Sequence, residues 1–341
     1  MNTIDLRSDT VVLPTKPMLD AMFSAVVGDD VFGEDPTITA LEEKACKMFG
    51  MEAGLYCPSG TMTNQIAIRC HVKPGDEVIC DKTSHIYNYE GGGIAANSGA
   101  SVRLIDGERG KIVVKQVVES INPDDYHYPI SKLVSIENTS NKGGGSVYTI
   151  QEMRDIKAVC EKFGLVFHLD GARLFNALVC IDESPEKVTG IFDSISICLS
   201  KGLGAPMGSL LLGSKGLILK ARRMRKMMGG GMRQAGYMAA AGIYALENNI
   251  ERLKEDHKRA AKLAETLRGL SFVKQIQPNE TNIVIFKLNE STQRDEFIKE
   301  LKRKGVLVVP LGEQVVRMVT HMEITDDMVA HVCSVLKEMS K

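Results

Sequence analysis

The sequence predicts an α/β protein, with a mostly parallel sheet in a large domain and a smaller C-terminal α+β domain. The first observation is that short β-rich runs alternate with helical patterns. These runs are residues 77–81, 101–105, 133–137, 165–170, 194–199 and 209–213. The second is helical periodicity between the runs, clearest over residues 150–163, where apolar side chains recur every three or four positions. Strands that alternate with helices favour a parallel sheet covered on both faces.

The third observation is that the pattern changes towards the C-terminus. Residues 236–270 predict one long or broken helix that links two domains. Beyond it we expect a strand, a helix, two strands and a helix, over residues 282–288, 293–304, 306–310, 315–321 and 325–339. We therefore predict three parts, of which the first is an N-terminal segment over residues 1–15. A large domain follows over residues 16–248 and a small domain over residues 249–341.

Composition and charge exclude several classes of function. Of the 341 residues, 44% are hydrophobic and 25% are charged, and the formal net charge of -1 gives no global field to recruit nucleic acid or an anionic membrane. No run is long and apolar enough to span a bilayer, and the first residues lack the apolar region of a secretory signal. The eight cysteines are scattered without a C-x-x-C pair, which favours reduced thiols in the cytoplasm over a disulfide framework or a metal site.

Two charged residues lie where predicted buried strands end. Asp170 closes the strand over residues 165–170, and Lys201 follows the strand over residues 194–199. Taken alone, Asp170 could be a helix N-cap and Lys201 a surface lysine. Ligands of such sheets bind beyond the carboxyl ends of the strands, however, and Glu137 ends a third strand in the same way. We therefore expect Asp170 and Lys201 to meet in one crevice.

An acid and a lysine in one crevice are what pyridoxal 5′-phosphate (PLP) chemistry requires. The lysine forms a Schiff base with the cofactor aldehyde, and the carboxylate keeps the pyridine nitrogen protonated. The apolar strand before Lys201 and the small residues over 202–206 partly desolvate the amine, which favours a nucleophile. Arg173, three residues after Asp170, adds a second charge turned towards the same crevice. The sequence therefore predicts a PLP site.

A candidate phosphate site lies earlier in the chain. Ser59, Gly60 and Thr61 form a turn before an apolar helix, and backbone amides at a helix start can cradle a phosphate, although the same residues are also a common helix cap. A glycine-rich loop over residues 229–231 follows the basic helix over residues 222–226. A cationic loop near a phosphate is favoured there over a solvated turn. Nucleic acid is disfavoured because the chain is neutral and no aromatic residues interleave the basic helix.

His85 and His127 are the candidate general bases. His85 follows a predicted strand, where it can stack on a cofactor ring and move protons. His127 lies between two tyrosines and is the second choice. For either histidine the alternative is a purely structural role. We also expect Tyr89, four residues after His85, to contact the substrate.

With these segments in place, the chain resembles the low-specificity L-threonine aldolase family, in the fold-type I (aspartate aminotransferase-like) group of PLP enzymes. The segments that carry the resemblance are residues 5–10, 28–37, 58–62, 137–139, 168–173, 199–203, 229–234 and 317–321. As a set they are highly specific. Residues 138–140 read Asn-Thr-Ser where family members often have Asn-Thr-His, so no role for a histidine at position 140 is carried over.

The resemblance implies a set of cofactor-binding residues. Lys201 carries the cofactor, Asp170 pairs with its ring nitrogen, and His85 stacks on its ring. The turn over residues 59–61 holds the phosphate. These roles agree with the site deduced above from the strand ends and the helix start.

The resemblance also implies contacts with the substrate and with other subunits. Ser8, Arg173 and Arg317 clamp the substrate carboxylate, and Arg173 also lies near the ring oxygen of the cofactor. Through Ser8, the N-terminal segment over residues 1–15 contributes to the active site. The family is typically a homotetramer whose active sites lie at dimer interfaces. We therefore expect Lys226 and Arg233 to reach the cofactor site of a neighbouring subunit.

The expected reaction is retro-aldol cleavage of L-threonine, L-allo-threonine and related β-hydroxy-α-amino acids to glycine and an aldehyde, which is acetaldehyde for threonine. The resemblance implies this activity, and the predicted PLP site supplies its chemistry. The first alternative is a β-eliminating lyase or an aminotransferase on the same fold. The second, from another class of function, is a non-catalytic amino-acid-binding protein.

Overall fold

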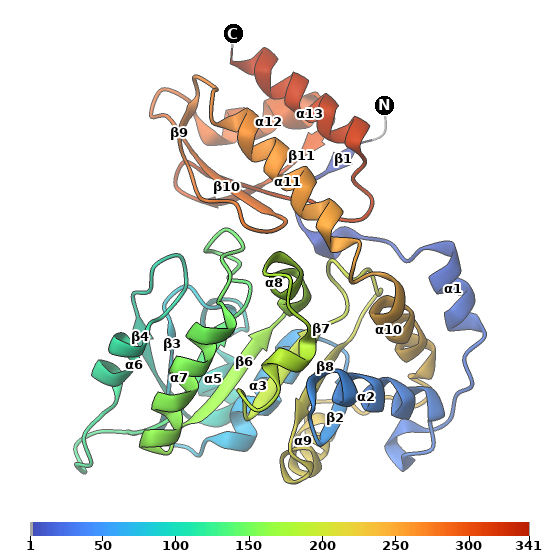
Figure 1. The fold of residues 1–341 in the computed structure, drawn as a ribbon, viewed down its shortest axis with the longest axis vertical. Helices are drawn as coiled ribbons and strands as arrows, with labels where there is room; N and C mark the ends of the chain where they lie inside the picture. Colours follow the sequence, from blue (N-terminus) through green and yellow to red (C-terminus); the bar gives the residue numbers. More distant parts are fainter. Residues whose placement is uncertain (1–2, 341) are drawn as a thin grey trace.

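The computed structural model describes residues 3–340 (Figure 1). It contains a large part built around a seven-stranded sheet and a small part with a four-stranded and a two-stranded sheet. Residues 1, 2 and 341 lie outside the described residues, so the start of the predicted segment 1–15 is not described. Within residues 3–340, no helix combines the length and apolar character needed to cross a membrane. The domain boundaries after residues 15 and 248 stay predictions.

The large sheet has seven strands in the order β2-β8-β7-β6-β5-β3-β4. The strands are β2 (Ala53–Cys57), β3 (Asp76–Asp81), β4 (Ser101–Ile105), β5 (Ile130–Glu137), β6 (Val166–Gly171), β7 (Ser194–Cys198) and β8 (Ser209–Gly213). Strands β7, β6, β5, β3 and β4 are parallel to one another, whereas β8 runs antiparallel to both β7 and β2. The predicted mostly parallel sheet is therefore confirmed, with β2 as an additional edge strand.

Helices cover both faces of this sheet, as expected for strands buried on both sides. They are α1 (Lys16–Phe23), α2 (Pro36–Phe49), α3 (Gly60–His71), α4 (His85–Asn88), α5 (Gly93–Ser98), α6 (Val114–Ser120), α7 (Ile150–Phe163), α8 (Leu174–Cys180), α9 (Lys215–Met227) and α10 (Gly236–Asn248). The 3-10 turns are η1 (Asp9–Val11), η2 (Asp30–Phe32) and η3 (Pro185–Val188). The apolar residues of α3, α5 and α9 pack on one face, and those of α2, α7, α8 and α10 on the other.

The small part is an α+β unit, as predicted. Its elements are α11 (Leu253–Leu267), β9 (Val273–Ile276), β10 (Ile283–Leu288), α12 (Arg294–Arg303), β11 (Val306–Leu307), β12 (Val309–Gly312), β13 (Val315–Val319) and α13 (Asp326–Met339). The helix predicted over residues 236–270 is broken into α10 and α11. The strand predicted over residues 306–310 is divided, because β11 and β12 join different sheets.

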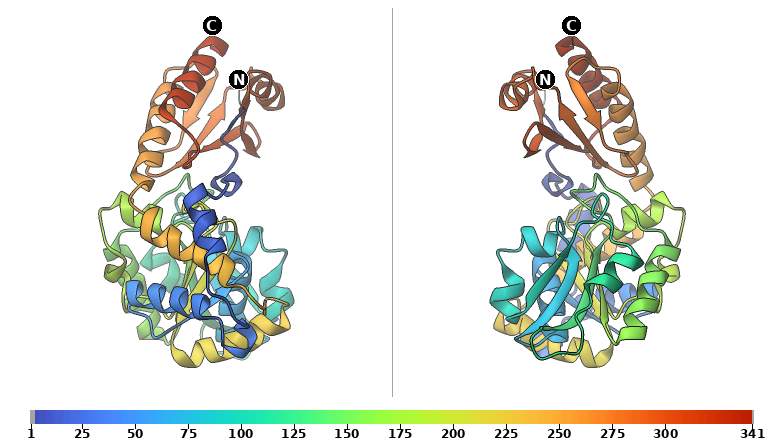
Figure 2. Two further views of the ribbon diagram at one scale, coloured as in Figure 1. Left: turned by 90° about the vertical axis from the view of Figure 1, so that its right-hand side faces the viewer. Right: turned by 90° about the vertical axis from the view of Figure 1, so that its left-hand side faces the viewer.

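The start of the chain belongs to the small part in space. Strand β1 (Ile4–Asp5) pairs in parallel with β11, and Ile4 and Leu6 lie in the small hydrophobic core. From there the chain passes through η1 into α1 on the large part. Figure 2 shows this blue segment at the junction of the two parts. The junction therefore contains residues from both ends of the sequence.

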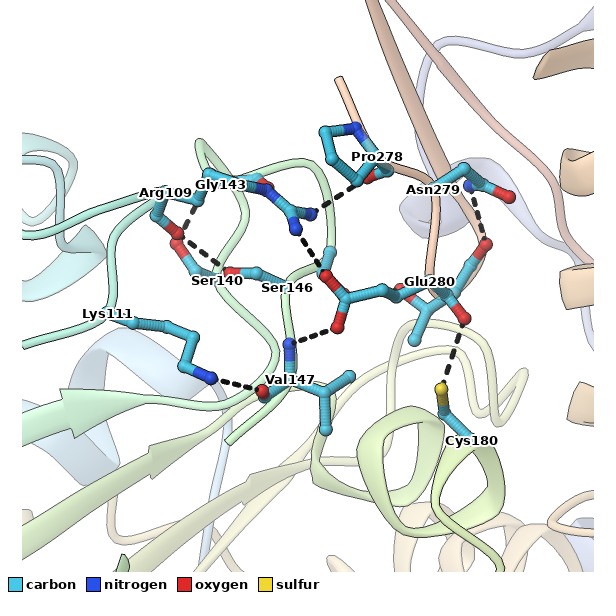
Figure 3. A network of polar contacts seen from close by, with 12 residues as sticks. Arg109, Lys111, Ser140, Gly143, Ser146, Val147, Cys180, Pro278, Asn279 and Glu280 are labelled. Atoms are coloured by element: carbon cyan, nitrogen blue, oxygen red, sulfur yellow. Dashed lines mark hydrogen bonds and ion pairs between the residues drawn. The ribbon is translucent and has the colours of Figure 1, made fainter. Parts of the chain in front are cut away.

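A polar network also joins the two parts (Figure 3). Arg109, after β4, donates hydrogen bonds to the carbonyl oxygens of Gly143 (3.1 Å) and Pro278 (2.8 Å) and forms an ion pair with Glu280. The second carboxylate oxygen of Glu280 accepts from the backbone N–H of Val147 at 3.2 Å. This network holds the loop between β9 and β10 against the loop between β5 and α7, which borders the site described next.

Candidate active site

Asp170 lies near the end of β6 and is buried. Its Oδ2 accepts a hydrogen bond from Asn64 Nδ2 at 3.0 Å, and its Oδ1 accepts from the backbone N–H of Ala172 at 3.2 Å. Helix α8 begins at Leu174 and has Arg173 as its N-cap residue. Asp170 is therefore not the N-cap of that helix, which removes the alternative considered from the sequence.

Lys201 lies in the turn that follows β7, one strand away from Asp170. The turn is closed by a hydrogen bond from the backbone N–H of Gly204 to the Lys201 carbonyl at 2.8 Å. The positive charge of Lys201 lowers the pKa of both Asp9 and His85, and the negative charge of Asp170 raises the pKa of His85. The structure thus brings Lys201 and Asp170 to the carboxyl ends of the adjacent strands β7 and β6, where both lie near His85.

His85 begins the short helix α4 and is held by a buried acid. Its Nδ1 lies 2.9 Å from Glu90 Oε1, and one nitrogen of its ring lies within 4.8 Å of carboxylate oxygens of both Glu90 and Asp170. Burial has the largest effect and lowers the pKa of His85. The hydrogen bond to Glu90 and the nearby negative charges outweigh it, so the pKa lies above its usual value. With Nδ1 facing Glu90, Nε2 makes no hydrogen bond to the described residues.

Glu137 fixes the backbone around this histidine. One of its carboxylate oxygens accepts from the backbone N–H of His85 and the other from that of Asn141, both at 2.9 Å. Burial raises the pKa of Glu137, and the charge of Asp170 adds to the effect. Glu137 thus lies at the end of a third strand, as predicted. Because both of its carboxylate oxygens accept backbone hydrogen bonds, it positions two loops.

Arg173 is held by a buried carboxylate from the start of the chain. Its Nε and Nη2 donate to the two oxygens of Asp9 at 2.8 and 2.6 Å, and Asn282 Nδ2 donates to the same carboxylate at 3.3 Å. Burial tends to raise the pKa of Asp9, but the charge and hydrogen bonds of Arg173 and the charge of Lys201 bring it well below its usual range. The N-terminal segment therefore orients one of the predicted carboxylate-binding arginines.

Arg317 comes from β13 of the small part and lies beside Arg173. Its Nη1 donates to Asn141 Oδ1 at 2.7 Å and its Nη2 to the carbonyl oxygen of Arg7 at 3.0 Å, while its buried Nε has no partner among the described residues. Burial, followed by the charge of Arg173, lowers the pKa of Arg317 to about 10. Asp9 pairs with Arg173, whereas Arg317 forms no ion pair with the described residues, so its positive charge is free to suit an anionic group.

Ser8 and Tyr89 lie at the edges of this arrangement. Ser8 caps η1, and its Oγ accepts from the backbone N–H of Thr10 at 3.2 Å. The partly exposed ring of Tyr89 is 5.6 Å from that of His85, centroid to centroid. Tyr89 is also among the groups that surround Arg317, so the tyrosine borders the arginine pair as well as the histidine.

The sequence is similar to proteins of a known family along nearly its whole length. A sequence model of the beta-eliminating lyase family matches residues 5–291. The low specificity L-threonine aldolase of Escherichia coli K12 is 41% identical over 334 residues, which cover 97% of each chain. The chain belongs to the threonine aldolase family. The low-specificity L-threonine aldolase 1 of Arabidopsis thaliana is 38% identical and covers 99% of this chain and 96% of its own.

The fold of this family member is also that of solved relatives. A threonine aldolase of Leishmania major superposes with a TM-score of 0.86 and 24% identity, over 99% of this chain and all of the other. A serine palmitoyltransferase of Sphingomonas wittichii superposes with a TM-score of 0.76 at 17% identity, over 98% of this chain and 86% of the other. At these identities the likeness concerns the fold alone. It confirms the predicted α/β fold with its small C-terminal domain.

The threonine aldolase family implies PLP as its cofactor, and the residues of this chain fit that group. Asp170 offers a buried carboxylate for a ring nitrogen, and Lys201 offers an amine at the neighbouring strand end. Helix α3 begins at Gly60, with Ser59 as its N-cap, and presents its first backbone N–H groups to an anion. A Cβ atom at Gly60 would lie 2.5 Å from Cys198 Sγ, so only glycine brings this helix start so close to β7. Each part that PLP needs is therefore present.

The glycine-rich loop over residues 229–231 packs against the same helix start. A Cβ atom at Gly230 would lie 2.3 Å from Met62 Sδ in the first turn of α3. Two cations of this region, Lys226 and Arg233, are predicted to reach the cofactor site of a neighbouring subunit. Lys226 is exposed, and Arg233 pairs with Asp29 at 2.8 Å. The loop is thus near the phosphate cradle, while the role predicted for its cations in a neighbouring subunit stays a prediction.

The structure does not bring His127 to this site within one chain. His127 lies in the exposed loop between α6 and β5, which enters β5 at the end opposite to Glu137, and its Nδ1 contacts Asp125 Oδ1 at 2.7 Å. Its role as second base therefore stays a prediction. Ser140, where family members often have histidine, is buried and accepts from the backbone N–H of Gly143 at 3.2 Å, so it closes a turn.

Sequence reasoning assigned no role to Glu90, Asp9 or Asn64. Glu90 follows His85 by five residues in a turn ahead of a glycine run, and an acid so close to a candidate base was the available signal. Asp9 lies inside a segment that carries the family resemblance, yet its partner Arg173 is 164 residues away. Asn64 is 106 residues from Asp170. No spacing in the sequence indicates these last two contacts.

Proposed function

We propose that this chain binds PLP through Lys201 and cleaves L-threonine, L-allo-threonine and related β-hydroxy-α-amino acids to glycine and an aldehyde. The observation that carries the proposal is the cluster of Lys201, Asp170 and His85 beside the arginines 173 and 317. The activity in the names of its full-length relatives supports the same substrate class.

The arginine pair would bind the substrate through its carboxylate. Arg173 is already oriented by Asp9, and Arg317 by Asn141 and the Arg7 carbonyl. A carboxylate between two guanidinium groups gains charge-assisted hydrogen bonds and a fixed direction. Because Arg317 comes from the small part and Arg173 from the large part, the substrate is held at their junction. Its Cα and Cβ are thereby fixed relative to His85.

His85 would act as the general base. Its Nδ1 faces Glu90, so Nε2 can accept the proton of the β-hydroxyl group as the Cα–Cβ bond breaks and the β-carbon becomes an aldehyde. When bound, PLP supplies the sink for the electron pair released from that bond. Asp170 holds the negative charge that stabilises a protonated ring nitrogen, and Asn64 and the Ala172 N–H keep its two oxygens in place.

A product assay tests the proposed function. The purified protein, supplied with PLP, is incubated with L-threonine, and glycine, acetaldehyde and 2-oxo acids are measured together. We expect glycine and acetaldehyde in equal amounts. A 2-oxo acid as the main product would instead indicate a β-eliminating lyase or an aminotransferase. Absence of both products, in protein that has taken up PLP, would contradict an enzymatic role in amino-acid cleavage.

Replacing Arg317 by alanine is expected to raise the KM for L-threonine roughly ten- to hundredfold, because a charge-assisted hydrogen bond to the carboxylate is lost. The matched control is Arg317→Lys, which keeps the charge but loses the planar fork and should show a smaller rise. PLP binding is measured in parallel and should stay unchanged in both variants. An unaltered KM in Arg317→Ala would place the substrate carboxylate elsewhere.

Replacing Glu90 by glutamine is expected to lower the pKa of His85, because the nearest negative charge is removed. His85 acts as a base only when neutral, so kcat/KM falls as pH drops through its pKa. The acidic limb of the pH profile should therefore move to lower pH, and maximal turnover should fall about tenfold as the base weakens. If the acidic limb of the kcat/KM profile does not move in Glu90→Gln, a group other than His85 is responsible for it.

We also infer a homotetramer in the cytoplasm. The exposed side chains of Phe32 and Leu219 line a groove of about 580 Å³ together with Lys226 and Gly231 of the cationic loop. Large exposed apolar residues at a groove suit a contact with a second copy of the chain. Such a contact would carry Lys226 and Arg233 towards a neighbouring site. The eight free cysteines, five of them buried, support a reducing compartment.

A further inference from the structure

A buried chain of polar groups runs behind Asp170. His168, on β6, is fully buried, with Nε2 3.2 Å from Asn64 Oδ1 and Nδ1 2.8 Å from Ser194 Oγ on β7. The other neighbour of Ser194 Oγ is His71 Nε2, at 3.1 Å, at the end of α3. Asn64, one turn into α3, then donates to Asp170. The helix and the two strands that carry these residues lie side by side (Figure 1).

The hydrogen positions of the first half of this chain follow from Asn64. Its Nδ2 donates to Asp170 Oδ2 at 3.0 Å and to Glu90 Oε1 at 2.9 Å, which uses both of its hydrogens. Its Oδ1 can only accept, so the hydrogen in the bond to His168 belongs to His168 Nε2. Burial lowers the pKa of His168 to about 4, so the ring is neutral and its Nδ1 is an acceptor.

The second half is fixed in the same way. Because His168 Nδ1 accepts, Ser194 must give it the hydroxyl hydrogen. Ser194 Oγ then accepts from His71 Nε2–H, and burial also lowers the pKa of His71 to about 4, so that ring is neutral too. Every hydrogen in the chain therefore points from His71 towards Asp170. No other arrangement satisfies all five groups with neutral histidines.

We propose that His71, Ser194, His168 and Asn64 form a directed hydrogen-bond relay that holds Asp170 as a hydrogen-bond acceptor and ties it, through the single amide of Asn64, to the Glu90–His85 pair. Asn64 and His168 are then positioning residues for the proposed PLP enzyme, and in this respect the inference rests on the proposed function. The relay keeps Asp170 from donating a hydrogen to Asn64. Its remaining capacity is thus directed to a ring nitrogen.

The alternative is that His168 has a purely structural role, as a core histidine whose ring nitrogens merely need hydrogen-bond partners. Such a residue needs hydrogen-bond partners but no particular direction of donation. Two observations favour the directed relay. The same Asn64 amide group contacts both the carboxylate for the ring nitrogen and the carboxylate that orients the base. A carboxylate held only as an acceptor also matches the role that Asp170 has in the proposed site.

Nitrogen NMR of ¹⁵N-histidine-labelled protein without cofactor tests the direction itself. At neutral pH we expect His168 and His71 each as a single neutral tautomer with the hydrogen on Nε2. Ser194→Ala should shift the signals of His168 Nδ1 and His71 Nε2. The matched control, Ser196→Ala, removes a buried hydroxyl two residues along the same strand, where Ser196 contacts Thr63 instead, and should shift neither. A hydrogen on His168 Nδ1, or a charged His168, would overturn the relay.

The link to Asp170 has its own readout. Asn64→Ala should weaken PLP binding about tenfold, because Asp170 loses a donor to a charged group, and should alter the absorbance of the bound cofactor. His168→Gln, which can still donate to Asn64, should retain more of the affinity than His168→Leu. Unchanged PLP affinity in Asn64→Ala would contradict the positioning role. These measurements need no turnover, so a protein with the expected tautomers but no threonine cleavage would reject the proposed function and leave the relay standing.

Discussion

Lys201→Ala is expected to reduce threonine cleavage by at least about a thousandfold, the scale on which removal of a covalent catalytic group acts. The amine of Lys201 is the group at this strand end that can attach the cofactor, and it lies in the same neighbourhood as His85 and Asp9. The visible absorbance of lysine-bound PLP should disappear with it. Steady-state assays of acetaldehyde release and an absorbance spectrum of the purified variant measure both effects.

The same variant has a second readout on the protein itself. The charge of Lys201 lowers the pKa of His85, so its removal should raise that pKa in cofactor-free protein, as followed by an NMR titration. Lys201→Arg is the matched control, because it also loses turnover but keeps the charge and therefore the His85 pKa. Undiminished cleavage in either variant would remove Lys201 from the mechanism. A His85 pKa that does not respond in Lys201→Ala would contradict its placement.

The central pair of the site could be predicted from sequence because each residue has a local signal. Asp170 and Lys201 end continuous apolar runs, and parallel strands bring their carboxyl ends to one edge of a sheet. The order β7-β6-β5 places Lys201, Asp170 and Glu137 on adjacent strands. The same reasoning gave most strand positions, since runs in the middle of a sheet are almost entirely apolar.

Elements at the edges could not be predicted so well. Strand β2 (Ala53–Cys57) begins with alanine and glycine, which have low strand propensity, and was not predicted. The direction of β8 follows from the short return after the Lys201 turn, where the backbone N–H of Leu199 donates to the Gly208 carbonyl at 3.0 Å. Periodicity shows that a segment is a strand but carries no information on whether it runs parallel to its neighbour.

The supporting residues of the site depend on contacts far apart in sequence. Asp9 meets Arg173, Arg317 meets Asn141, and Asn64 meets His168, at sequence separations of 164, 176 and 104. Such pairs form only when the small part docks on the large part or when α3 packs under β6. A single sequence gives residue types and local spacing, so it identifies the charged groups but not which of them neutralise one another.

Asp170→Asn is expected to lower maximal turnover by about 10²–10³-fold, because the fixed charge that stabilises the protonated cofactor ring is lost where electron density develops. PLP should still attach through Lys201, so the visible absorbance should remain but change in its response to pH. Asp170→Glu is the matched control. It keeps the charge but displaces it from Asn64 and Ala172, which hold the native carboxylate, and should be impaired less.

The two variants that remove a charge, Asp170→Asn and Lys201→Ala, should shift the pKa of His85 in opposite directions. Asp170 raises the pKa of His85 and Lys201 lowers it, so Asp170→Asn should shift the acidic limb of the kcat/KM profile to lower pH, whereas Lys201→Ala should raise the histidine pKa in cofactor-free protein. Loss of any cofactor-binding group would lower activity, but opposite shifts of one histidine pKa require a negative and a positive charge that both lie near its imidazole. Wild-type turnover in Asp170→Asn, or a shift of its acidic limb to higher pH, would separate Asp170 from the reacting centre.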